Sequence, residues 1–263
     1  MTRLDRYGPW ALVTGASDGI GQTVARQLAA AQLNVVLVAR RENALRALAA
    51  ELIAAHQVQT RVIAVDLTEP DALHTVEHHT SDLDVGVAVL AAGFGCAEPF
   101  LDAPLRSQLD MIAVNITAVT ALTHSLGQRM SARGAGAIVL FSSLLGWHGV
   151  PGQVSYAATK AYVQALAEGL GRELAPRGVG VLAVAPGPVH SGFAQRAGMT
   201  ISFADTPETI AAATLSALGR STTIVPGWRG KLLTAAMTTL PRRIRIMLLG
   251  RIVSGMRTPA STG

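Results

Sequence analysis

A tyrosine and a lysine, Tyr156 and Lys160, lie four positions apart in a segment with a helical pattern of apolar residues. Residues at this spacing share one face of a helix, so we expect the phenol and the ammonium to be neighbours. A free tyrosine loses its proton near about pH 10, and a nearby cation favours the phenolate and lowers that pKa. Such a pair can exchange a proton with an alcohol or a carbonyl compound. The same spacing also arises by chance as a surface pair.

Two further polar residues favour an active site over a chance pair. Ser143 follows a predicted strand, 13 residues before Tyr156, where its hydroxyl can hold a substrate oxygen. Asn115 stands between Val114 and Ile116 in a long apolar helix. A carboxamide there can bend the helix and hold a water molecule on a proton path, or it is simply a buried asparagine with its hydrogen bonds satisfied.

A glycine-rich loop follows the first predicted strand and precedes a helix. It reads Thr14-Gly15-Ala16-Ser17-Asp18-Gly19-Ile20-Gly21. Glycines permit a tight turn and close approach of a pyrophosphate, which sits at the free N–H groups of a helix N-terminus. The spacing is G-x-x-x-G-x-G, and its place after strand one predicts a dinucleotide site. Asp18 adds negative charge there, or caps the helix beside Ser17.

The end of the second predicted strand indicates which nicotinamide cofactor is bound. Ala39 is followed by Arg40 and Arg41, and the next carboxylate, Glu42, is predicted to start a helix. A basic side chain here accommodates the 2′-phosphate of NADP, whereas an acidic one binds the ribose of NAD. We therefore predict NADP(H) rather than NAD. Asp66, after the third strand, is predicted either to accept a hydrogen bond from adenine or to cap the following turn.

Short β-branched apolar runs alternate with helical patterns along the chain, which predicts right-handed βαβ crossovers. The fold class is α/β, a doubly wound and mostly parallel sheet of about seven strands with helices on both faces, in a single domain over residues 1–263. The predicted strands span residues 11–13, 34–39, 61–65, 85–91, 137–141, 180–185 and 222–225. The predicted helices span residues 19–31, 42–56, 69–80, 104–130, 155–175 and 206–218.

Composition excludes several other classes of protein. Hydrophobic residues make up 49% of the chain, which suits a large core with a buried parallel sheet. The net charge of +5 comes from scattered arginines, so we expect no nucleic-acid partner. The single cysteine, Cys96, excludes an intrachain disulfide, and the histidines lack metal spacing. We find no secretory signal and no run of 18 apolar residues, and we expect a cytoplasmic protein without a spanning helix.

The segment 228–256 differs from the rest of the chain. Apolar residues alternate there with arginines and are interrupted at Pro241, which predicts one or two amphipathic helices. We expect this extension to cover a substrate cleft or to pack on another subunit. Peripheral contact with a membrane is the alternative, because arginine beside leucine, isoleucine and methionine suits an interfacial helix.

In chain order, these motifs resemble the short-chain dehydrogenase/reductase family over about residues 8–226. The resemblance implies an Asn-Ser-Tyr-Lys tetrad made of Asn115, Ser143, Tyr156 and Lys160. Ser143 would orient the carbonyl, Tyr156 would donate the proton and Asn115 would position a relay water. Lys160 would bind the nicotinamide ribose and lower the pKa of the tyrosine.

The resemblance also implies a set of cofactor-binding residues, in which the backbone of Val189 contacts the nicotinamide carboxamide. Two positions depart from the family pattern, since Leu90-Ala91-Ala92-Gly93 replaces Asn-Asn-Ala-Gly and Ser191 replaces a threonine. The implied cofactor-binding residues are Gly15, Ser17, Asp18, Gly19, Ile20, Arg40, Arg41, Asp66, Leu67, Ala92, Gly93, Asn115, Tyr156, Lys160, Pro186, Gly187, Val189 and Ser191.

These observations predict an oxidoreductase that moves hydride between NADP(H) and a carbonyl or alcohol. The loop from Pro188 to Thr206 contains Phe193, Met199, Ile201 and Phe203, and its apolar side chains suit an apolar substrate. An NADP-binding regulator without catalysis is the alternative. A sugar-nucleotide epimerase would need a longer C-terminal region and the other glycine spacing. The resemblance also implies a homodimer or homotetramer.

Overall fold

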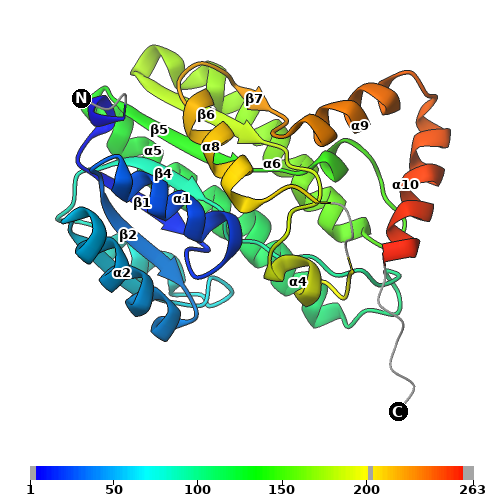
Figure 1. Ribbon diagram of the computed structural model, residues 1–263, viewed down its shortest axis with the longest axis horizontal. Helices are drawn as coiled ribbons and strands as arrows, with labels where there is room; N and C mark the ends of the chain where they lie inside the picture. Colours follow the sequence, from blue (N-terminus) through cyan, green and yellow to red (C-terminus); the bar gives the residue numbers. More distant parts are fainter. Residues whose placement is uncertain (1–3, 201–203, 257–263) are drawn as a thin grey trace.

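The computed structural model describes residues 4–200 and 204–256, and within these ranges the strands form a seven-stranded parallel sheet (Figure 1). The strand order is β3-β2-β1-β4-β5-β6-β7, and every neighbouring pair is parallel. The doubly wound sheet predicted from the sequence is therefore confirmed. The strands are Trp10–Thr14 (β1), Asn34–Ala39 (β2), Thr60–Ala64 (β3), Val85–Leu90 (β4), Gly136–Phe141 (β5), Val179–Val184 (β6) and Thr223–Ile224 (β7).

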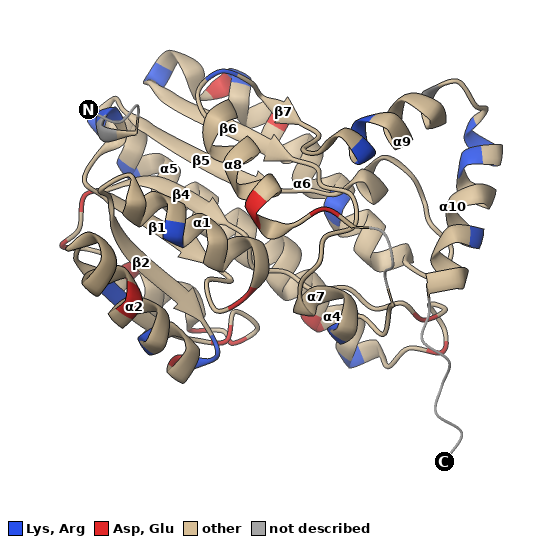
Figure 2. Ribbon diagram, viewed as in Figure 1, with Lys and Arg blue, Asp and Glu red and all other residues tan. Residues whose placement is uncertain are grey.

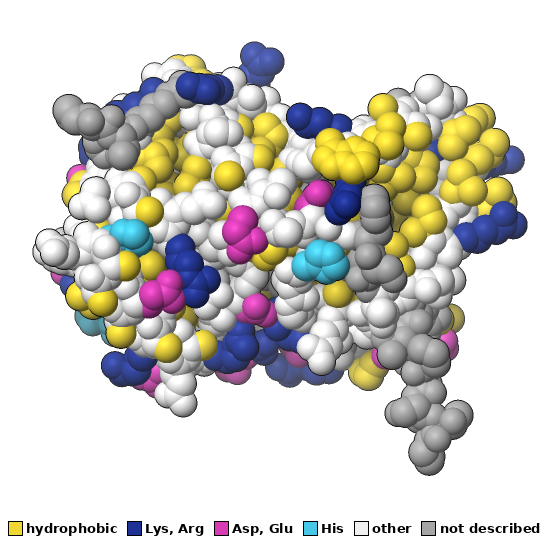
Figure 3. Space-filling view, in the orientation of Figure 1, with side chains coloured by type: hydrophobic (Ala, Val, Ile, Leu, Met, Phe, Trp, Pro, Cys, Tyr) yellow, Lys and Arg dark blue, Asp and Glu magenta, His cyan; other side chains and the backbone are white. Residues whose placement is uncertain are grey.

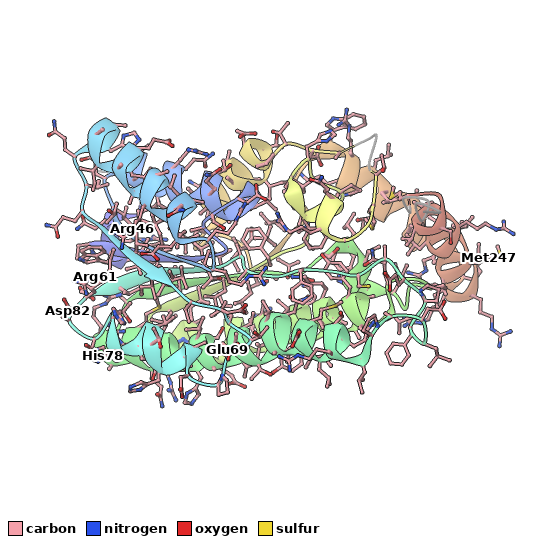
Figure 4. All side chains as sticks on the ribbon, turned by 90° about the horizontal axis from the view of Figure 1, so that it is seen from below. Arg46, Arg61, Glu69, His78, Asp82 and Met247 are labelled. Atoms are coloured by element: carbon pink, nitrogen blue, oxygen red, sulfur yellow. The ribbon has the colours of Figure 1, made fainter. Side chains whose placement is uncertain are left out.

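Helices cover both faces of the sheet, which separates two helical layers in the view of Figure 4. Helices α1, α2 and α8 pack on one face, and α3, α5 and α6 pack on the other. Strands β1, β4 and β5 are buried along their whole length, which explains their continuous apolar sequence. The helices of the two layers are Gly19–Ala30 (α1), Glu42–His56 (α2), Ala72–His78 (α3), Leu105–Ile112 (α4), Val119–Arg133 (α5), Val154–Glu173 (α6) and Pro207–Ala217 (α8).

Most predicted boundaries agree with the structure to within two residues, but two helices differ. The helix predicted over residues 69–80 begins only at Ala72, since Pro70 disfavours helical backbone at the residue before it. The helix predicted over residues 104–130 runs from Leu105 to Arg133 and contains a π-helical turn, η2 (Ala113–Ala118). The wider turn surrounds Asn115, where a bend in the helix is one of the two alternatives that the sequence leaves open.

The sequence predicts no membrane-spanning helix, and the long helix over residues 105–133 bears on that prediction. Within the described residues it is the one helix that is long and apolar enough to cross a membrane by length and composition alone. Core helices of soluble proteins share this composition, and the α5 part packs against β4 and β5. Contact with the sheet therefore explains the apolar character of the α5 part, whereas Leu105, Leu109 and Ile112 of α4 are exposed.

The C-terminal extension forms two helices beside the main body, separated at Pro241 as predicted (Figure 1). They are α9 (Trp228–Thr238) and α10 (Arg242–Met256). Met237, Leu249 and Val253 from these helices form a small apolar core with Val150 and with Ala157 of α6. The extension is thus fixed against the segment that carries the predicted catalytic tyrosine.

The loops at the carboxyl ends of the strands hold the predicted functional residues. The strand order reverses between β1 and β4, where β1 leads into the glycine-rich loop and β4 into Ala91-Ala92-Gly93. In open parallel sheets, ligands bind at such a switch point, outside the carboxyl ends of the strands. The fold therefore brings the sequence motifs to one edge of the sheet.

Candidate active site

A cleft of about 610 Å³ lies at the carboxyl edge of the sheet. It runs from the glycine-rich loop to the C-terminal helix α10. Asn115 is the one predicted site residue that does not line it, because this side chain is fully buried. The predicted residues that line the cleft are Gly15, Ser17, Asp18, Gly19, Ile20, Arg40, Arg41, Asp66, Leu67, Ala92, Gly93, Ser143, Tyr156, Lys160, Pro186, Gly187, Val189 and Ser191.

Tyr156 is half-buried near the start of α6, and the Ser143 side chain is close enough to its hydroxyl to lower the pKa of the phenol. Ser143 precedes a 3₁₀ turn, η3 (Leu144–Trp147), and its Oγ accepts a hydrogen bond from the amide of Leu145 at 3.2 Å. Burial raises the pKa of Tyr156 to about 12, against the smaller effect of Ser143, which lowers it. Tyr156 therefore carries its proton at neutral pH.

Lys160 is buried beneath the tyrosine. Its Nζ donates a hydrogen bond to the Phe141 carbonyl at 2.8 Å and lies 5.6 Å from the centre of the Tyr156 ring. Burial lowers the pKa of Lys160 to about 8. The prediction that this lysine brings the Tyr156 pKa below its ordinary value is wrong for the protein alone, because burial disfavours both charged forms.

Asn115 uses its whole carboxamide within the protein. Its Oδ1 accepts a hydrogen bond from the amide of Phe94 at 3.1 Å, and its Nδ2 donates to the Phe94 carbonyl at 2.9 Å. Nδ2 also donates to Oγ1 of Thr159 at 3.1 Å, and the Thr159 hydroxyl donates to the Tyr156 carbonyl at 2.8 Å. Asn115 is therefore a buried asparagine with its hydrogen bonds satisfied, which is the second of its two predicted roles. It links the loop after β4 to α6.

The glycine-rich loop turns sharply between β1 and α1. Gly15 has a φ of +68°, and a Cβ atom there would lie 2.9 Å from the amide nitrogen of Ala92. Thr14, which the sequence analysis did not select, accepts a hydrogen bond from that same amide at 3.0 Å. The loop is thereby fixed against the end of β4, and the first residues of α1, a helix end whose N–H groups lack partners within the helix, line the cleft.

Two arginines follow β2 and line the cleft beside this loop. Arg41 donates a hydrogen bond to the Ser17 carbonyl at 2.9 Å, and Arg40 lies 3.5 Å from a carboxylate oxygen of Asp66. Asp18 occupies the N-cap position of α1, but its side chain makes no capping hydrogen bond, so the predicted capping role is wrong. Its carboxylate instead pairs with Arg196 at 2.8 Å and lies 3.8 Å from Arg41, which offsets its negative charge.

Asp66 caps the turn that follows it, in agreement with one of its two predicted roles. Its Oδ1 accepts hydrogen bonds from the backbone amide and the hydroxyl of Thr68, at 3.0 and 2.9 Å. Burial alone would raise the pKa of Asp66, but the Thr68 hydrogen bonds and Arg40 hold it below the ordinary value. Its carboxylate is therefore ionised at the cleft wall.

The far end of the cleft is apolar. Phe193 and Met199 come from the segment after β6, in agreement with the predicted apolar loop, and the ring centre of Phe193 lies 5.5 Å from that of Tyr156. Ile201 and Phe203 of the same prediction lie outside the described residues. Helices α9 and α10 add a wall that includes Leu249 and Val253, so the extension lines the cleft, in agreement with one of its predicted roles. The pattern of the sequence does not identify the individual residues of this wall.

Comparison with known proteins decides the family. The sequence profile of the short chain dehydrogenase family matches residues 9–201. The chain belongs to this family. It is 34% identical over 218 residues to the very-long-chain 3-oxoacyl-CoA reductase-A of Danio rerio, an alignment that covers 81% of this chain and 68% of the relative. It is 30% identical over 240 residues to the 7β-hydroxysteroid dehydrogenase of Collinsella aerofaciens, which covers 88% of this chain and 90% of the relative.

Solved structures of short-chain dehydrogenases share the whole fold. A structure described in a study of 7β-hydroxysteroid dehydrogenase stereoselectivity superposes with a TM-score of 0.89 and 27% identity, covering 95% of this chain and all of the other. A short-chain dehydrogenase from Sphingobium yanoikuyae in complex with NADPH gives a TM-score of 0.79 and 32% identity, covering 88% of this chain and 94% of the other. Members of the family are oxidoreductases that use a nicotinamide cofactor.

The shape of the cleft in this short-chain dehydrogenase also fits a nicotinamide cofactor, independently of the comparison with relatives. A side chain at Gly15 would collide with the loop after β4, and at Gly93 a Cβ would lie 3.0 Å from Oδ1 of Asn115. Both positions therefore need glycine for this close packing. Their backbones line the cleft together with the N-terminus of α1, which is a suitable place for a pyrophosphate. Gly93 keeps this shape although the family's two asparagines are replaced by Leu90 and Ala91. Ser191 keeps a local role, because its Oγ accepts a hydrogen bond from the amide of Phe193 at 3.4 Å.

Proposed function

We propose that this protein is an NADP(H)-dependent carbonyl reductase or alcohol dehydrogenase that acts on a bulky apolar ketone or the corresponding secondary alcohol. The observation that carries the proposal is that Ser143, Tyr156 and Lys160 line one cleft, with Ser143 close to the Tyr156 hydroxyl. The walls of this cleft are basic near Arg40 and Arg41 and apolar near α10. A proton donor thus lies between a cofactor half and a substrate half.

The proposed chemistry divides between cofactor and protein. The nicotinamide, when bound, supplies or accepts the hydride. Tyr156 holds a proton at neutral pH because burial raises its pKa, so it serves as the acid that gives this proton to the developing alkoxide. Ser143 holds the substrate oxygen beside the phenol. In the reverse direction Tyr156 must accept a proton from the alcohol, which becomes easier as the pH rises.

Lys160 and Asn115 take supporting roles in this proposal. The ammonium of Lys160 lies beneath the Tyr156 ring, where it stabilises negative charge that develops on the phenol. It is also placed to bind the nicotinamide ribose, as the resemblance implies. Asn115 fixes Phe94 and, through Thr159, the first turn of α6, so it positions Tyr156.

NADP(H) is the proposed cofactor because two guanidinium groups, of Arg40 and Arg41, line the cleft next to Ser17. Guanidinium groups form paired, charge-assisted hydrogen bonds with phosphate. The negative charge of Asp18, which would oppose a 2′-phosphate, is offset by Arg41 and Arg196. The NADPH complex of the Sphingobium yanoikuyae relative is consistent with this choice.

An apolar substrate is proposed from the far walls of the cleft. Phe193, Met199, Leu249, Val253 and Met256 present side chains without charge near the tyrosine. Such walls gain free energy by excluding water from an apolar ligand. The relatives named for 3-oxoacyl-CoA and hydroxysteroid chemistry have substrates with large apolar parts, which supports the same class here.

A homodimer or homotetramer is proposed from exposed apolar side chains on α4 and α6. Leu105, Leu109 and Ile112 of α4 are exposed, as are Val154 and Tyr162 of α6. Large apolar side chains that gather on one surface are typical of an interface. Light scattering should give the mass of an oligomer, and a Leu109→Arg variant should reduce that mass to one chain. A monomeric wild type would contradict this part of the proposal.

Peripheral membrane contact is proposed for α9 and α10, in a protein that is otherwise cytoplasmic. Apolar side chains gather over these helices in Figure 3, and the helices carry basic but no acidic residues in Figure 2. Trp228, Leu232 and Met247 are exposed, and Met247 lies on the outer side of α10 (Figure 4). We expect sedimentation with anionic vesicles and none with neutral ones. Equal recovery from both would contradict the contact.

A panel of carbonyl compounds tests the proposed function. Purified protein is mixed with NADPH or NADH and with ketones that range from small to polycyclic, and the nicotinamide absorbance is followed. We expect NADPH to be consumed with bulky apolar ketones and little reaction with small ones. If NADPH binds but no carbonyl or alcohol supports turnover, the alternative of an NADP-binding regulator is favoured instead.

A further inference from the structure

A second cavity, of about 250 Å³, lies beside the main cleft beneath α9 and α10. Its walls are mainly apolar and include Trp147 of η3 and Met237 of α9. Leu144 and Leu249 line both this cavity and the main cleft, so the two spaces adjoin across these side chains. A long apolar ligand that starts at Tyr156 can therefore extend toward the second cavity.

Two buried polar atoms of residues that line this cavity have no hydrogen-bond partner within the part of the chain that the structure describes. Arg245 and His148 both line it, and the Nε atom of Arg245 and the Nδ1 atom of His148 are buried. Neither atom has a hydrogen-bond partner among the described residues. A buried polar atom without a partner costs free energy, most of all when it belongs to a charged group. Two such atoms on one apolar cavity are best explained by a ligand that supplies acceptors.

The electrostatic surroundings indicate the sign of that ligand. The pKa of His148 is lowered by burial and by the positive charges of Arg245 and Arg242. No acidic residue follows Glu208 in the sequence, whereas eight arginines and lysines do. Helices α9 and α10 therefore contain no carboxylate to balance these cations (Figure 2). The cavity favours an anion over a neutral or cationic group.

We propose that this cavity binds a carboxylate at the far end of the substrate, so that the substrate is an apolar keto acid or hydroxy acid. This inference rests on the proposed function and adds the anionic end of the substrate to it. Arg245 donates from Nε to the carboxylate, and the apolar walls hold the adjoining carbon atoms. A volume of about 250 Å³ suits a carboxylate with a few carbon atoms, not a whole nucleotide carrier such as coenzyme A.

Binding of a simple probe tests the proposal without any turnover. Decanoate and decanol share a chain length and differ in the charged end. Titration calorimetry of the full-length protein should show decanoate binding at least about tenfold more tightly than decanol. Arg245→Gln and Arg245→Met should abolish the difference. Arg243→Gln, which removes an exposed arginine from the same helix turn, should keep it.

Three results would overturn the proposal. One is equal binding of decanoate and decanol by the wild type, and another is an equal loss in the Arg243→Gln control. The third is a preference for decanoate that persists in both Arg245 variants, provided that their melting temperatures match the wild type. A variant that melts early is replaced in the comparison by His148→Phe, which should reduce the preference several-fold.

Turnover separates this proposal from the proposed function. A long-chain keto acid, its methyl ester and its coenzyme A thioester are compared as substrates with NADPH. The keto acid should have the highest kcat/KM, and Arg245→Gln should reduce it toward that of the ester. Reduction of the ester alone would retain the proposed function and overturn the carboxylate site. Preference for the thioester would mean that the protein recognises the anionic coenzyme A carrier, and it would overturn the carboxylate site as well.

Discussion

The Nζ atom of Lys160 lies 5.6 Å from the ring centre of Tyr156, and its hydrogen bond goes to the Phe141 carbonyl. Both side chains are desolvated, so the pKa of the phenol is raised to about 12 and that of the ammonium is lowered to about 8. Without a cofactor, the pair favours a neutral phenol. This arrangement suits proton donation to a carbonyl, and each of its parts leads to a measurable consequence.

The buried lysine should make stability depend on pH. The pKa of Lys160 is about 8 in the folded chain and about 10.5 in the unfolded chain. Between these values the unfolded chain binds more protons, so the free energy of unfolding increases with pH. From about pH 7 to about pH 9.5 this lysine should add about 2 kcal/mol, which Lys160→Met should lack. Urea unfolding at both pH values measures the difference.

Lys231 provides the matched control for that experiment, since it is the other lysine of the chain and is exposed. Lys231→Met should show the same increase with pH as the wild type. An increase that is equally large in Lys160→Met would mean that another group titrates, and it would contradict the assigned pKa of Lys160.

The two arginines after β2 should discriminate between the cofactors. Replacement of Arg40 and Arg41 by alanine should weaken NADPH binding about tenfold or more, because paired contacts to a phosphate are lost. NADH binding should change by less than about threefold. Fluorescence titration measures both affinities. Arg46→Ala is the control, because Arg46 is exposed on α2 and pairs with Glu42 at 2.6 Å. Equal weakening of NADPH and NADH would contradict the choice of NADP(H).

Thr159 should matter for both stability and the site. Thr159→Val removes the acceptor of the Asn115 amide and the donor to the Tyr156 carbonyl. An unpaired buried amide group should lower the free energy of unfolding by about 1–3 kcal/mol. Thr214→Val is the control, since its buried hydroxyl donates only to the Ile210 carbonyl of its own helix. If both variants lose the same free energy of unfolding in urea, the link from Asn115 to α6 stabilises the fold no more than an ordinary hydrogen bond within a helix.

Much of this site could be predicted because its residues are close in sequence or follow strand ends. Tyr156 and Lys160 are one helical turn apart, and the glycine-rich loop directly follows β1. Such local spacing determines geometry once the element is known. The carboxyl-edge loops then meet because the sheet is parallel, so the predicted residues line one cleft.

Other features depend on contacts between distant segments. The Asn115 carboxamide bonds to Phe94 and Thr159, and no periodicity in the sequence selects those partners. The pKa of Tyr156 depends on burial, which the spacing of charges does not reveal. The pattern at residues 228–256 predicts amphipathic helices, but it does not predict that α10 packs against Val150 and Ala157. At Pro70, a local signal for the late start of α3 was present and was missed.

Turnover by Tyr156→Phe is the most direct test of the central claim. The change removes the hydroxyl close to Ser143 and keeps the ring that packs near Phe193. Tyr162→Phe, on the same helix, removes a hydroxyl that bonds to Thr120 at 2.8 Å and serves as the control. With NADPH and a bulky apolar ketone, Tyr156→Phe should lower kcat by about 10²–10⁴ while NADPH still binds. Tyr162→Phe should react like the wild type. Undiminished turnover by Tyr156→Phe would contradict the assignment of this tyrosine as the proton donor.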